Sequence, residues 1–88
     1  MKRKDYTMRA EIRDNRFFTA VKIVFKCYDA EGDTLDKILM MLFKNLDRLV
    51  FTIKADHVKN RISIIGIVDN SLIAGSVFCL LRERMLDL

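Results

Sequence analysis

The residues best suited to binding chemistry are basic side chains near the start of the chain. Residues 1–26 contain eight Lys and Arg against three acidic residues, whereas residues 27–88 contain eight against nine. Lys and Arg bind phosphate groups, and each phosphate that they neutralise releases counterions, which favours nucleic-acid binding. The candidate nucleic-acid contacts are Lys2, Arg3, Lys4, Arg9 and Arg13. The alternative interpretation is a solvated strand face that follows a basic start.

The other reactive side chains do not form a recognisable catalytic or metal-binding pattern. Cys27 and Cys79 are far apart in the sequence, no CxxC pair occurs, and His57 is the single histidine. A zinc site needs closely spaced thiolates and imidazoles. Both cysteines lie among apolar residues, which predicts buried, reduced thiols. Because phosphate-binding loops and dinucleotide motifs are also missing, we expect a non-enzymatic protein without cofactor or metal.

The length and composition predict one small globular domain. The chain has 88 residues, a formal net charge of +4, 51% hydrophobic residues and 32% charged residues. No apolar run reaches the length of a membrane span, and Asp5 and Arg9 stand where a signal peptide would be apolar. We expect a single α+β domain over residues 1–88, with residues 1–5 as a flexible basic start, in the cytoplasm and without membrane contact.

The first half of the chain predicts two strands and a helix that position the basic residues. Apolar and polar residues alternate over residues 6–13, the pattern of a half-buried strand. A turn at residues 14–16 leads into a β-prone segment at 17–26, expected to be antiparallel to the first. After a loop at residues 28–32, Asp33 is the expected N-cap of a helix. Its apolar stripe at helical spacing runs from Leu35 to Leu49.

The second half repeats this order. Residues 49–55 and 61–68 predict a hairpin around a polar loop, and Asp69, Asn70 and Ser71 predict the cap of a helix over 72–85. The order is therefore strand, strand, helix, strand, strand, helix. We expect an α+β two-layer sandwich, with an antiparallel sheet of three to four strands and both helices on one face.

The closing helix is apolar on nearly all sides. The stripe expected to face the sheet comprises Ile73, Val77, Leu80, Leu81 and Met85. A glycine in mid-helix costs about 1 kcal/mol relative to alanine, and we expect it where another backbone comes close. The opposite flank is therefore the candidate partner or dimer interface, formed by Ala74, Gly75, Phe78, Cys79 and Arg82. The alternative is that Phe78 and Cys79 extend the internal core.

Four segments of the chain share a pattern with a known family. They are the β-prone segment 20–25, the helix 33–46, the strand 61–68 and the capped helix start 69–77. Together they resemble the small dimerising subunit of the KEOPS complex (the LAGE-type family), which installs threonylcarbamoyl on adenosine in tRNA. The chain departs from the family at Ile73-Ala74, where members carry Leu-Arg, and at Phe78-Cys79, where they carry Asn-Ser. These departures suit a divergent paralogue.

The resemblance implies a non-catalytic, dimerising scaffold. Such subunits form dimers, dock their helices onto a separate catalytic subunit and support tRNA binding. The expected partners are a second copy or a related chain, other subunits of a tRNA-modifying complex, and tRNA. Two alternatives remain open. The first is a stand-alone RNA- or DNA-binding α+β module that uses the basic N-terminal strand. The second is a small viral or accessory protein that blocks a partner through the Phe78 face.

Overall fold

The elements follow the spacing of apolar residues along the chain. The computed structural model describes residues 5–29 and 33–88. The period of two produces the strands, and the helical spacing produces the helices. The elements are β1 (Tyr6–Asp14), β2 (Thr19–Cys27), α1 (Asp33–Asn45), β3 (Phe51–Asp56), β4 (Arg61–Val68) and α2 (Ser71–Met85).

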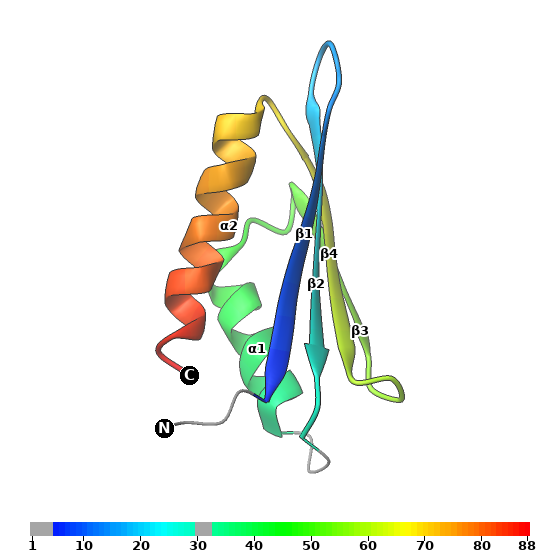
Figure 1. Ribbon diagram of the computed structural model, residues 1–88, viewed down its shortest axis with the longest axis vertical. Helices are drawn as coiled ribbons and strands as arrows, with labels where there is room; N and C mark the ends of the chain where they lie inside the picture. The colour runs from blue at the N-terminus through cyan, green and yellow to red at the C-terminus, as the bar shows by residue number, and fades with distance from the viewer. Residues whose placement is uncertain (1–4, 30–32) are drawn as a thin grey trace.

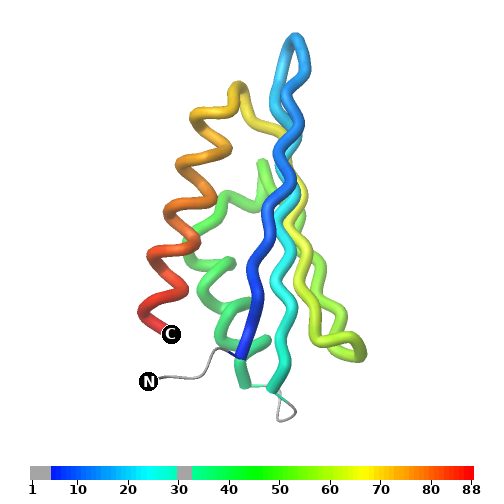
Figure 2. The backbone as a smooth tube through the Cα atoms, in the orientation of Figure 1, coloured from blue at the N-terminus to red at the C-terminus, as the bar shows by residue number. Residues whose placement is uncertain are grey.

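The strands form one antiparallel sheet in the order β1-β2-β4-β3. Both helices lie on the same face of this sheet (Figures 1 and 2). The predicted two-layer α+β sandwich is therefore confirmed, with four strands. Neither α1 nor α2, within the described residues, is long and apolar enough to cross a membrane.

The core lies between the sheet and the two helices. Ile23, Phe25, Ile62 and Ile64 project from the central strands and are fully buried. The helices cover them with residues that are also buried, namely Leu35, Ile38 and Leu42 of α1 and Ala74, Leu81 and Met85 of α2. Burial of this apolar surface is the main favourable term that holds the helices on the sheet.

A glycine in β4 makes room for an aromatic ring in this core. Gly66 pairs with Phe51 of β3, and a Cβ atom on Gly66 would clash with the Phe51 ring. The missing side chain thus lets the buried ring lie directly on the sheet.

The residue that caps the helix start was predicted correctly for α2 but not for α1. Asn70 caps α2 as predicted, because its Oδ1 accepts a hydrogen bond from the Ile73 amide at 3.0 Å. At α1 the carboxylate belongs to Asp29, whose Oδ2 accepts a bond from the Thr34 amide at 3.1 Å. Asp33 is the first residue of the helix itself. The prediction of Asp33 as N-cap was therefore wrong.

The sequence also placed the end of the first helical stripe incorrectly. The stripe was expected to continue to Leu49, but α1 ends at Asn45. Leu49 lies in the turn before β3 and its side chain is 97% exposed. Leu49 therefore has the helical spacing of the stripe but is not part of the helix.

The second face of the sheet, which we call the outer face, is covered by neither helix. In Figure 1 the sheet is seen nearly edge-on, with α1 and α2 together on its left. The hairpin that joins β1 to β2 extends beyond the helices at the top of the view. Among the described residues, no helix lies on the outer face.

Candidate nucleic-acid interface

Strand alternation and pairing place six basic residues on the outer face. Residues that face each other across an antiparallel pair point to the same side of a sheet. Arg9 of β1 lies opposite Val24 of β2, and Lys26 of β2 lies opposite Arg61 of β4. The exposed cations of this face are Arg9, Arg13, Lys22, Lys26, Lys54 and Arg61, accompanied by two acidic residues, Glu11 and Asp56. The face therefore has an excess of positive charge.

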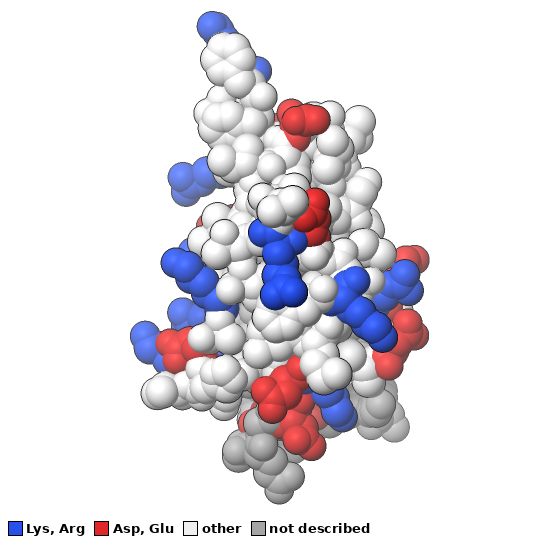
Figure 3. Space-filling view, turned by 180° about the vertical axis from the view of Figure 1, so that it is seen from behind, with Lys and Arg blue, Asp and Glu red and all other residues white. Residues whose placement is uncertain are grey.

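These cations form no close ion pairs within the part of the chain that the structure describes, although Glu11 faces Lys22 and Asp56 faces Arg61 across the sheet. Among residues 5–29 and 33–88, no Lys or Arg nitrogen lies within 4.0 Å of a carboxylate oxygen. The contact that does fall within this limit joins His57 Nε2 to Asp36 Oδ1 at 3.9 Å. In Figure 3 basic side chains project along the margin formed by the outer face and at the tip of the β1–β2 hairpin. Their charge is available to an anionic ligand.

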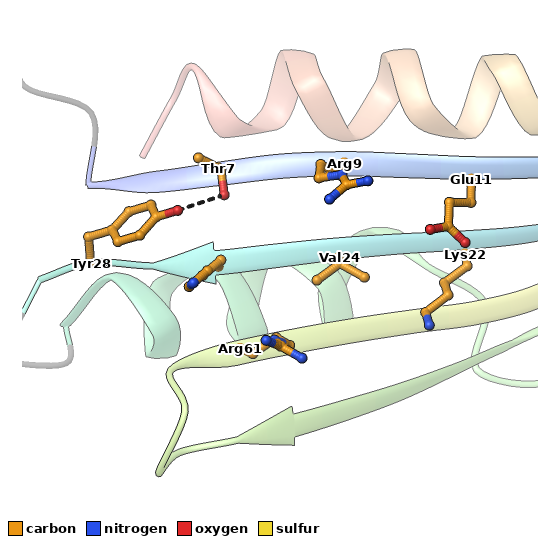
Figure 4. Close-up of a pocket in the computed structure, with 8 residues that line it drawn as sticks. Thr7, Arg9, Glu11, Lys22, Val24, Tyr28 and Arg61 are labelled. Carbon is orange, nitrogen blue, oxygen red and sulfur yellow. Dashed lines mark hydrogen bonds between the residues drawn. The ribbon is translucent and has the colours of Figure 1, made fainter.

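One end of the outer face is hollowed. The depression has a volume of about 380 Å³ and is lined by Thr7, Arg9, Glu11, Lys22, Val24, Lys26, Tyr28 and Arg61. Figure 4 shows Arg9 and Arg61 on either side of Val24, on the three neighbouring strands β1, β4 and β2. We call this depression the basic hollow. It combines an apolar floor with cations at its sides.

Tyr28 forms one end of the basic hollow. Its backbone amide donates to the Asp5 carbonyl at 2.8 Å, which holds it beside the start of β1. Its hydroxyl lies 3.5 Å from Thr7 Oγ1, and the Lys26 ammonium lies 5.6 Å from the centre of its ring. The side chain is nevertheless 57% exposed. The ring is therefore positioned by its neighbours and still accessible.

The predicted nucleic-acid contacts are only partly within this site. Arg9 and Arg13 are exposed on the outer face, and Arg9 lines the basic hollow. Lys2, Arg3 and Lys4 lie outside the described residues. Lys26, Tyr28 and Arg61 also line the hollow but are not among the contacts predicted from the sequence. Arg61 joins the site because β4 lies next to β2, a strand order that residue spacing does not indicate.

The five residues proposed as a partner interface do not form one exposed flank. Ala74 is fully buried on the face toward the sheet, whereas Ile73, predicted to face the sheet, is 40% exposed. Phe78 is half-buried and packs against the core. Nothing lies within 4 Å of the position of a Cβ on Gly75, so no other part of the described chain makes the close approach expected there.

Phe78 and Arg82 border a groove beside the edge strand. The groove is also lined by Tyr6, Thr7 and Met8 of β1. The Arg82 guanidinium lies 5.8 Å from the centre of the Phe78 ring. These two residues of the predicted interface are therefore placed where β1 and α2 meet.

The two cysteines differ in their surroundings. Cys27 is buried, as predicted, but Cys79 is exposed, so the prediction of two buried thiols was wrong for Cys79. Burial, and secondly the negative charge of Asp29, raises the pKa of the Cys27 thiol to about 11. Cys27 is thus protonated at neutral pH and is a weak nucleophile. Within the described residues, no three His, Cys, Asp or Glu side chains are grouped as metal ligands.

Comparisons with family models, curated proteins and solved structures find no match to this chain. The resemblance to the KEOPS subunit therefore stays a prediction, and the functional interpretation depends on the geometry of the outer face.

Proposed function

We propose that this protein is a non-catalytic module that binds nucleic acid through the outer face of its sheet. The observation that supports this best is the set of six exposed cations on that face against two acidic residues, with no Lys or Arg ion pair among the described residues. A flat surface of this kind fits a phosphate backbone, because counterion release drives its binding. RNA is the preferred ligand, because the resemblance implies a tRNA-linked role.

A salt titration of RNA binding tests this proposal. Fluorescence anisotropy with a labelled tRNA should give an affinity that falls steeply with salt concentration. Arg9→Gln and Arg61→Gln should each reduce the slope of log K against log salt by about 0.7 to 0.9, the contribution of one phosphate contact. Lys44→Gln, which removes one charge from α1 on the helical layer, should leave the slope unchanged. Equal slopes for all three variants, or no binding at low salt, would contradict the proposal.

A second candidate function is a dimeric scaffold of a cytoplasmic, KEOPS-like tRNA-modification assembly, as a divergent paralogue. A feature of β1 favours dimerisation. β1 is a nine-residue edge strand with one neighbour, β2, and an unpaired edge favours pairing with another chain.

The residues of β1 are complementary to those of an antiparallel second copy. If the two-fold axis passes through Ala10, Arg9 of each copy faces Glu11 of the other, and Met8 faces Ile12. Oppositely charged residues that face each other across a strand pair stabilise it, and so do apolar pairs. Phe78 and Arg82, which border the groove beside β1, would lie next to such a contact. Pairing at the β1 edge leaves the outer face open, and Arg9 would then lie between Glu11 of the second copy and a ligand on that face.

A further inference from the structure

The basic hollow differs from the rest of the outer face because it contains an accessible aromatic ring. We propose that it binds one nucleotide of a single-stranded nucleic acid, with the phosphate between Arg9, Lys26 and Arg61 and the base on the ring of Tyr28. This inference rests on the proposed function, since it names the class of nucleic acid and the site that recognises it.

The phosphate position follows from the arrangement of the three cations. Arg9, Lys26 and Arg61 belong to three adjacent strands and line the same depression. Lys26 and Arg61 lie directly opposite each other in the β2–β4 pair, and Asp56 of β3 lies opposite Arg61 on its other side. Like charges that face each other across a strand pair destabilise a sheet, and one carboxylate balances only one of these two cations. A bound phosphate would lower the remaining repulsion, because its oxygens accept hydrogen bonds from both side chains.

The base position follows from Tyr28. The Thr7 hydroxyl lies 3.5 Å from the Tyr28 hydroxyl and the Lys26 ammonium lies 5.6 Å from the ring centre, so both side chains border the ring before a ligand arrives. More than half of the side chain is exposed. A preorganised aromatic side chain beside a row of cations is the usual platform for a nucleobase, because the cations hold the backbone while the base stacks.

This geometry selects single strands over duplexes. In a duplex both faces of a base are covered by the neighbouring bases, so a base can lie on a protein ring only when it is unstacked. The floor of the hollow is Val24, an apolar side chain that makes no hydrogen bonds with bases. We therefore expect binding with little dependence on base sequence.

The inference is tested by measuring the binding of three short nucleic-acid strands of equal length. They are an oligouridylate, an oligothymidylate and an abasic deoxyribose-phosphate strand, all measured by anisotropy with the full chain. Wild-type protein should bind the oligothymidylate more tightly than the abasic strand. Tyr28→Leu should weaken binding of the oligothymidylate by about 5- to 150-fold, the effect of losing one base stack. The same variant should leave the abasic strand unaffected.

Two further variants separate stacking from other effects. Tyr28→Phe keeps the ring and loses the hydroxyl, so its affinity should stay within about twofold of wild type. Phe17→Leu removes the 81% exposed ring at the tip of the β1–β2 hairpin and should have no effect. The oligouridylate shows whether an RNA strand binds as the oligothymidylate does, and tighter binding of the oligothymidylate than of the abasic strand supports the inference.

The outcomes distinguish this inference from the proposed function. Equal affinity for the oligothymidylate and the abasic strand, an unchanged Tyr28→Leu affinity, or tighter binding of a duplex would overturn the single-strand site. The proposed function would survive these results if Arg9→Gln still reduced the salt slope. If wild-type protein bound none of these nucleic acids at low salt, both would fail.

Discussion

At the scale of single residues, the side chain of Asp29, which follows β2, forms a hydrogen bond with the first turn of α1. Its carboxylate accepts the Thr34 amide, and this hydrogen bond holds its pKa below the ordinary value of 3.8. The sequence suggested Asp33 for this role, because Asp33 directly precedes the apolar stripe. Spacing alone could not identify Asp29, since it lies five residues before Thr34 and an N-cap normally lies two or three residues before the amide that it bonds.

The lowered pKa of Asp29 predicts how stability depends on pH. The carboxylate takes up a proton at a higher pH in the unfolded chain than in the folded chain. Its contribution is therefore present above pH 3.8 and is lost as the pH falls through the lower, folded-state pKa. Asp29→Asn should lower the midpoint of urea unfolding at neutral pH, and its difference from wild type should shrink below pH 3.8.

Circular dichroism during urea unfolding at neutral and acid pH measures this difference. Asp87→Asn, at the exposed C-terminal end, serves as the matched control and should follow wild type throughout. A difference between Asp29→Asn and wild type that stays constant with pH would contradict the assignment.

At the scale of elements, the sequence predicted the six helices and strands but only part of the inward side of α2. Alternation in β2 is clear because its inward residues, apart from Thr19, are apolar. Leu81 and Met85 of the predicted α2 stripe are buried, but Ala74 takes the inward position that was predicted for Ile73. Because α2 is apolar on nearly all sides, its residue spacing could not separate the inward residues from their neighbours.

The second candidate function, a dimeric scaffold, predicts that two copies pair through the edge strand β1. Sedimentation equilibrium should show a dimer for wild-type protein. Glu11→Arg should weaken the dimer by about tenfold or more, because it places like charges opposite Arg9 at two symmetric positions. The charge swap Arg9→Glu with Glu11→Arg should restore it.

A control for this experiment lies on the far strand of the sheet. Lys54→Glu changes the charge of the same face on β3, where its cross-strand partner is the uncharged Ser63, and should leave the dimer intact. Wild-type protein that sediments as a monomer at every accessible concentration would refute pairing through β1. So would a charge swap that fails to restore it.

At the scale of the whole molecule, the sheet concentrates charge that the sequence distributes over three segments. The sequence analysis assigned the basic character to the N-terminal third, and Arg9 and Arg13 do lie on the outer face. Lys54 and Arg61 come from the second half of the chain and join them through β3 and β4. That part of the site could not be predicted without the strand order, because long-range strand pairing is not encoded in local alternation.

Two-dimensional amide NMR of the labelled protein, titrated with a short oligouridylate, tests the outer-face claim most directly. We predict that the shift changes concentrate on β1, β2 and β4 around Arg9, Lys26, Tyr28 and Arg61, and that the helical layer changes little. Shift changes confined to α1 and α2, or a spectrum that does not respond to the oligouridylate at low salt, would contradict it.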